Sequence, residues 1–184
     1  MKAKKFLVLP ILLFIALAAF GRDVFKEQEF KEQGFKVTSP FPLVHQPTET
    51  GTDTLGNPTK IDSFDSEILM GEMYVVQVTT FTTDISVGVD YAYLDRMLAS
   101  MADGHKKMGE IVHEPQRTRG GWIQTVPAAW TTWTITNDDG STMYIHEQIC
   151  VRGNHLYVLR QAYKTPSKDI DTVWLMFYAS LDLP

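Results

Sequence analysis

The sequence has little cysteine and no excess of basic charge. It contains one cysteine, Cys150, in 184 residues, so no intramolecular disulfide can form. Lysine and arginine number 17 against 22 aspartates and glutamates, which gives a formal net charge of −5. A nucleic-acid-binding protein needs a basic surface that neutralises phosphates, so this balance argues against that class. Aromatic residues make up 11%, which argues against a disordered chain and for one folded domain.

The compact sequence motifs of several enzyme classes are also missing. There is no Gly-x-Ser-x-Gly nucleophile elbow, no phosphate-binding P-loop and no glycine pattern for a dinucleotide. His146 and Cys150 share one face of a predicted strand, but four residues separate them by about 13 Å. That distance is too long for a shared metal ion or for a nucleophile–base hydrogen bond. We therefore predict no catalytic residues, no metal site and no cofactor, and a buried Cys150.

The first 21 residues have the pattern of a secretory signal peptide. Three lysines without an acid precede an apolar run over 6–20, which is shorter than the roughly 20 residues of a membrane-spanning helix. Small residues allow cleavage after Ala18 or after Gly21. The alternative is an uncleaved N-terminal anchor, which would link the protein to a membrane. The sequence thus predicts an exported protein, either periplasmic or secreted.

A short charged tandem follows the predicted signal peptide. Within residues 22–33, the tetrapeptide Phe-Lys-Glu-Gln occurs at 25–28 and again at 30–33. A period of five residues matches neither a helix face nor a strand face. We therefore predict a charged spacer over 22–33, with a partner-binding tail as the alternative, and a single folded domain over 34–184.

The pattern of residues 34–184 predicts strands, a helix, further strands and a final helix. A loop or mobile hairpin is expected over 45–60, and Asp90 is expected to cap a helix that unwinds at Gly104. The last helix is expected to begin with Thr165 as its cap and Pro166 in its first turn. Strands are expected near 35–37, 61–70, 73–81, 110–113, 130–136, 141–151 and 155–163. This order predicts the α+β class, a mostly antiparallel sheet with helices packed on it.

Several short stretches of residues 34–184 occur in an order that resembles a known superfamily. They are Gly34-Phe35-Lys36-Val37 with Pro40, Tyr74-Val75-Val76, Tyr93-Leu94-Asp95, Val126-Pro127-Ala128, the run from Gly153 to Leu159, and the run from Phe177 to Leu181. Together they resemble the PsbP-like superfamily, which includes extrinsic proteins of the photosynthetic oxygen-evolving complex and exported bacterial relatives. The resemblance implies an α-β-α sandwich and a binding or assembly role, and it supplies no catalytic triad or cofactor motif. The photosystem role is not carried over, because fold does not determine function and nothing here marks a thylakoid protein.

One predicted loop combines residue types that are common at protein interfaces. Arg117, Arg119 and Trp122 place two cations and an indole in an acidic protein. Loops often carry binding residues, and Arg and Trp are enriched among the residues that dominate binding energy. The alternative is a solvated turn with Trp122 folded into the core. We predict these three residues as partner-binding residues.

Three functional classes are compatible with these observations. The favoured one is an exported non-enzymatic binding or assembly module with a protein partner in the cell envelope. The second is a periplasmic carrier of a small ligand or metal, which requires a cavity with convergent polar groups. The third is a hydrolase whose distant Asp, His and Arg residues meet in one cleft with shifted pKa values.

Overall fold

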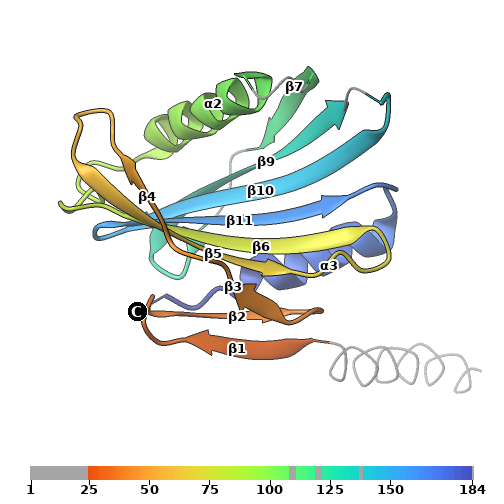
Figure 1. The fold of residues 1–184 in the computed structure, drawn as a ribbon, viewed down its shortest axis with the longest axis horizontal. Coiled ribbons are helices and arrows are strands. Elements are labelled where there is room, and N and C mark those ends of the chain that lie inside the picture. The colour runs from red at the N-terminus through yellow and green to blue at the C-terminus, as the bar shows by residue number, and fades with distance from the viewer. Residues whose placement is uncertain (1–24, 108–110, 119–121, 137–138, 184) are drawn as a thin grey trace, which may run out of the picture.

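The computed structural model describes residues 25–107, 111–118, 122–136 and 139–183 (Figure 1). They form a large antiparallel sheet in the order β3-β5-β6-β11-β10-β9-β7, with β4 on β5 and β8 on β9. The strands of this sheet are β3 (Leu43–His45), β4 (Glu49–Thr52), β5 (Pro58–Ser66), β6 (Glu72–Thr80), β7 (Ile111–Thr118), β8 (Trp122–Ile123), β9 (Val126–Thr136), β10 (Thr142–Arg152) and β11 (His155–Tyr163). The helices are α2 (Tyr91–Lys107) and α3 (Lys168–Ala179). The predicted α+β class with a mostly antiparallel sheet is confirmed.

The segment predicted as a charged spacer is folded over part of its length. Strand β1 (Lys26–Phe30) pairs antiparallel with β2 (Phe35–Ser39), so this prediction is corrected for those residues. The ring of Phe30 lies 4.8 Å from that of Phe35 and 4.4 Å from that of Phe64. A five-residue period cannot predict such a strand. Phe30 packs on residues of other strands, and strand β1 has no alternating apolar face of its own.

Several element boundaries also differ from their predicted positions. Residues 45–60, expected as one loop or hairpin, contain the end of β3, all of β4 and the start of β5. Gly104 lies inside α2, which continues to Lys107. The N-cap of α3 is Ser167 rather than Thr165, because the Ser167 Oγ accepts a hydrogen bond from the Ile170 backbone N–H at 3.3 Å.

The two helices pack on opposite faces of the sheet (Figure 1). Helix α3 places Trp174 and Phe177 in a core with Cys150, whose side chain points to the face opposite that of its neighbour Ile149. Helix α2 places Leu94 and Leu98 against Ile149 on the other face. The predicted burial of Cys150 is confirmed, and this burial raises the pKa of its thiol to about 12. Among the described residues, no helix is long and apolar enough to cross a membrane.

Replacing Phe30 tests whether β1 belongs to the folded domain. Because its ring packs on Phe35 and Phe64 while remaining partly exposed, we expect Phe30→Ala to lower the free energy of unfolding by about 2 kcal/mol. Phe25→Ala, which changes the corresponding residue of the first repeat just before β1, is the matched control and should cost much less. Urea denaturation measures both, and equal small losses would show that β1 contributes nothing to stability.

Candidate functional site

The α2 face of the sheet is covered unevenly. Helix α2 contacts β7, β9 and β10, whereas Ser63, Asp65, Gln77 and Arg160 remain partly exposed on β5, β6 and β11. The antiparallel register aligns one cross-strand row on this face, running Asp65, Val75, Arg160, Glu147, Thr131 from β5 to β9. Charged side chains therefore occupy the middle of the sheet, where the row passes from the covered half into the open half.

An ion pair between Glu147 and Arg160 lies at this boundary. The Glu147 carboxylate is fully buried and accepts hydrogen bonds from Arg160 Nε and, at 2.7 Å, from the indole N–H of Trp133. Arg160 Nη1 also donates to the side-chain oxygen of Gln77 at 3.0 Å. A buried carboxylate is tolerated only when it is paired and hydrogen-bonded. The Arg160 side chain is 25% exposed, so the guanidinium connects this buried charge to the open face.

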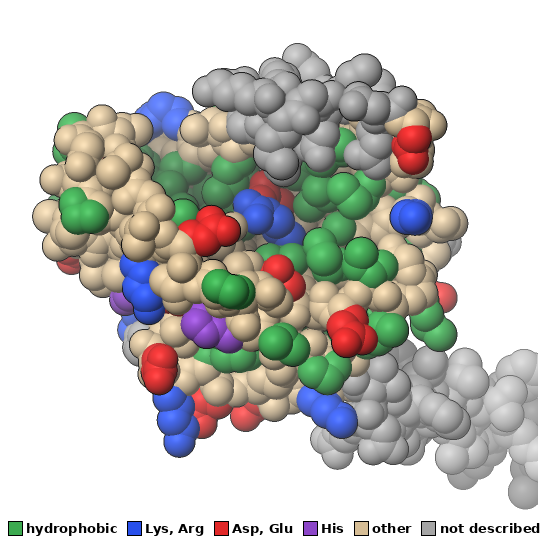
Figure 2. All heavy atoms as spheres, viewed as in Figure 1, with side chains coloured by type: hydrophobic (Ala, Val, Ile, Leu, Met, Phe, Trp, Pro, Cys, Tyr) green, Lys and Arg blue, Asp and Glu red, His purple; other side chains and the backbone are tan. Residues whose placement is uncertain are grey.

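A cleft of about 480 Å³ lies beside the ion pair. Its floor includes Ser63, Asp65 and Gln77, and the Ser63 hydroxyl donates to the Asp65 carboxylate at 2.6 Å. The segment from Gln46 to Glu49 forms its outer wall. Figure 2 shows this face hollowed between α2 and the β4–β5 hairpin, with acidic and basic side chains gathered in the hollow. Hydroxyl, amide and carboxylate groups thus converge on one concave surface.

Asp62 holds the outer wall of the cleft in place. Its side chain is 1% exposed and receives contacts from Thr48 Oγ1 at 2.7 Å, Lys60 Nζ at 2.9 Å and His45 Nε2 at 3.0 Å. Burial by itself would raise the pKa of Asp62, but the hydrogen bonds from Thr48, Lys60 and His45 outweigh it and lower that pKa. A backbone bond from Gln46 N–H to the Ser63 carbonyl, at 2.8 Å, adds a second attachment.

The structure places two of the three predicted partner-binding residues, Arg117 and Trp122, in strands rather than in the expected loop. Arg117 lies in β7 opposite Thr131, which extends the Asp65–Arg160–Glu147 row by one strand. Trp122 lies in β8 opposite Pro127, and Arg119 falls outside the described residues. The loop prediction is therefore corrected for Arg117 and Trp122, whose backbones belong to strands. Their role in partner binding stays a prediction.

His146 lies on the α3 face, away from the cleft. Its Nδ1 is 2.9 Å from Thr132 Oγ1, and its Nε2 is 3.1 Å from the Tyr163 hydroxyl and 3.2 Å from Asp171 Oδ1. Burial lowers the pKa of His146, and the hydrogen bond that its ring makes to the Asp171 carboxylate opposes that effect. The ring also stacks on Trp174 at 5.5 Å. These contacts explain His146 as a member of the packed α3 interface.

Within the described part of the chain, no group of three His, Cys, Asp or Glu residues is arranged to hold a metal ion.

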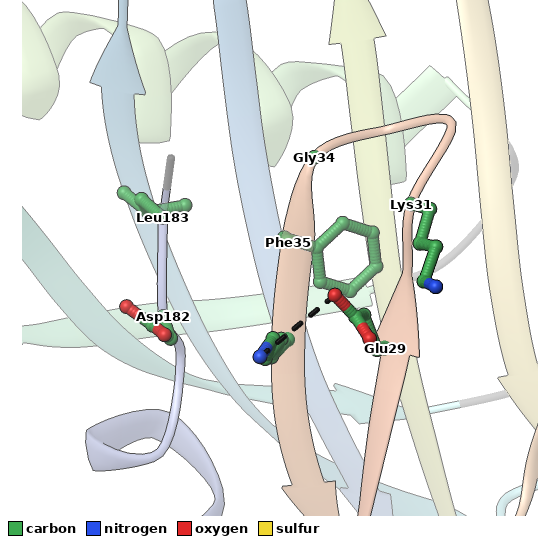
Figure 3. A pocket seen from close by; sticks show the side chains of 7 residues that line it. Glu29, Lys31, Gly34, Phe35, Asp182 and Leu183 are labelled. Carbon is green, nitrogen blue, oxygen red and sulfur yellow. Dashed lines mark ion pairs between the residues drawn. The ribbon is translucent and has the colours of Figure 1, made fainter.

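A second hollow of about 250 Å³ lies between the β1–β2 turn and the C-terminal residues Asp182 and Leu183 (Figure 3). Its charged groups include Glu29 and Lys36, which pair with each other at 3.8 Å, and both are more than 40% exposed. Because these groups are largely solvated, this hollow offers a weaker basis for a binding site than the cleft.

The cleft residues were not identified from the sequence. Glu147 and Arg160 are charged residues in the middle of two strands with many apolar residues, and that position is the signal that the sequence offers. Asp65 and Gln77 carried no signal, because only the pairing of β5 with β6 and of β6 with β11 brings them beside Arg160.

Comparison with known proteins adds little to this geometry. No protein-family model matches the chain, and no curated protein sequence matches it. A crystal structure from Bacteroides thetaiotaomicron, determined at 1.50 Å resolution, is similar with a TM-score of 0.42 and 13% sequence identity. The alignment covers 82% of this chain and 45% of that one, so the chain spans less than half the length of this structural neighbour.

Removing one partner of the buried ion pair should destabilise the fold. We expect Glu147→Gln to lower the free energy of unfolding by about 3 kcal/mol, because Arg160 loses its buried counter-charge while remaining only partly hydrated. Adding Arg160→Gln should recover part of that loss. Glu29→Gln, which removes the exposed pair with Lys36, should cost under about 1 kcal/mol. Urea denaturation of wild type, Glu147→Gln, Arg160→Gln and the double variant gives the coupling energy, and additive losses would contradict a direct interaction.

The attachment of the cleft wall should depend on pH. The lowered pKa of Asp62 means that its ionised form stabilises the folded state, so the contribution is complete above the ordinary aspartate pKa of about 3.9. It is lost as the pH falls through the lower pKa of the folded protein. Asp62→Asn should therefore be less stable than wild type at pH 7, and the difference should shrink below about pH 4. Chemical denaturation between pH 7 and pH 3 measures it, and a constant difference would refute the assignment.

Proposed function

We propose that this protein is an exported, non-enzymatic binding or assembly module with a PsbP-like α-β-α sandwich. The basic start and short apolar run of the first 21 residues support export. The packing of α2 and α3 on opposite faces is compatible with the sandwich that the resemblance implies. The partner is expected in the cell envelope, and its binding site is the open half of the α2 face.

The cleft beside the Glu147–Arg160 pair is the observation that carries this proposal. Its volume of about 480 Å³ falls within the range of roughly 300–1,000 Å³ that is usual for ligand sites. Asp65 and Gln77 come from two neighbouring strands and line the cleft, and Arg160 on a third strand donates a hydrogen bond to Gln77. Residues on a rigid sheet hold such groups in fixed positions, which lowers the entropic cost of binding a partner.

The same cleft supports a second candidate, a periplasmic carrier of a small ligand. A volume of this size accommodates a small molecule or a short peptide segment of a larger partner, and both uses require the same polar floor. The hydrolase hypothesis receives less support. His146 and Asp171 meet on the α3 face, whereas neither of them lines the cleft.

Two indole N–H groups allow a direct test of the site. Trp133 donates to Glu147, the partner of Arg160, whereas Trp174 lies in the core on the α3 face. Titrating ¹⁵N-labelled mature protein with fractions of its own cell envelope should shift the Trp133 indole signal while leaving the Trp174 signal in place.

The matched variant is Arg160→Lys, which keeps the charge but loses the fork geometry that contacts both Glu147 and Gln77. The active fraction should bind it at least about tenfold more weakly, a loss of roughly 1.4 kcal/mol. Binding that shifts Trp174 instead, or that is lost only when Arg117, Arg119 and Trp122 are replaced by Ala, would place the site elsewhere. Failure of every fraction to bind would contradict the proposed function.

A further inference from the structure

The β5–β6 hairpin ends in an exposed apolar tip, defined here as Ile68, Leu69 and Met70. Their exposed fractions are 70%, 40% and 98%. The tip lies at the end of the sheet opposite to the β4–β5 hairpin (Figure 1). Scattered apolar residues are ordinary on protein surfaces, but three consecutive ones on a projecting turn form a contiguous patch that marks an interaction site.

The backbone of the turn makes Met70 an unfavourable choice for the isolated protein. Leu69 and Glu72 exchange two backbone hydrogen bonds, at 3.0 and 2.9 Å, so Met70 and Gly71 form a two-residue turn. Both residues have positive φ, 55° and 82° respectively. Such a turn favours Asn, Asp or Gly at its first position, because other side chains clash with the backbone in the left-handed region.

Packing on the described residues does not compensate for this conformation, since the Met70 side chain is almost entirely in solvent. Positions that break a local rule without a gain inside the fold are expected at functional sites. The base of the tip is well ordered by a hydrogen bond from the Tyr74 backbone N–H to Ser66 Oγ at 2.9 Å. The tip is therefore preorganised for docking, which reduces the entropic cost of binding.

The charges around the tip indicate what kind of surface it meets. Glu67 and Glu72 flank the tip along the chain. One cation, Lys164, comes directly after Tyr163, the residue of β11 that pairs with Glu72 of β6. This acidic excess disfavours the negatively charged surface of an anionic lipid bilayer and favours a basic protein surface.

We propose that the tip docks into an apolar pocket of a protein partner, with lysine or arginine residues at the border of that pocket. Met70 fills the pocket, and Glu67 contacts its basic border. This surface is separate from the cleft proposed above, so the protein would have two binding surfaces at different ends of the sheet.

The test starts with a diazirine amino acid introduced at position 70 of the full chain in its own cells. Irradiation should cross-link a protein, and mass spectrometry of the cross-linked peptide should locate an apolar pocket with basic neighbours. The purified partner is then titrated with wild-type protein, Met70→Asn and Leu55→Asn. Leu55 is 85% exposed near the other end of the sheet and is the matched control.

Met70→Asn should raise the melting temperature, because Asn suits the left-handed turn position, and yet should weaken partner binding at least tenfold. A merely structural role for Met70 cannot produce this combination. Leu55→Asn should bind like wild type, and Glu67→Gln should weaken binding and reduce its dependence on salt. Cross-links only to lipid or to a second copy of this chain, no cross-link at all, or unchanged binding by Met70→Asn would overturn the proposal.

Discussion

The ion pair between the Arg160 guanidinium and the Glu147 carboxylate determines which part of the α2 face can be covered by apolar side chains. A carboxylate at the centre of a sheet must be paired, and Arg160 on the neighbouring strand is placed directly opposite it. The same guanidinium reaches Gln77 on β6, so it cannot be covered by an apolar helix without losing water and partners. The open half of this face is therefore a consequence of where the charge pair lies.

Coverage of the sheet follows from that arrangement. Helix α2 contributes Leu94 and Leu98 to an apolar cluster with Ile149 and Val158, next to the charged row. On the opposite face, α3 and the β1–β2 hairpin cover a continuous apolar core that includes Phe35. One face of the sheet thus holds much of the packed core, whereas the other combines packing with an exposed polar surface. The proposed binding cleft therefore lies on a rigid sheet whose core stays packed on the other face.

Local patterns predicted the elements well and their limits poorly. The three-to-four-residue recurrence of Leu94 and Leu98 identified α2, but the helix continues through Gly104 to Lys107, although glycine's intrinsic preference predicts an earlier end. Strand β1 escaped prediction because Phe30 finds its partners on β2 and β5. The candidate site was missed for a related reason. Arg160 and Gln77 are 83 residues apart, and no short-range pattern joins them.

The sequence by itself determined the α+β class, the positions of both helices between blocks of strands, and the burial of Cys150, because each depends on periodicity or on the polarity of single residues. The tertiary structure alone decided which charges meet and which apolar groups remain exposed. Strand register aligned Asp65, Arg160 and Glu147 in one row, and a shift of one residue would have turned each of these side chains to the opposite face. The alignment depends on pairing between strands that are far apart in the sequence, so it exists only in the assembled sheet.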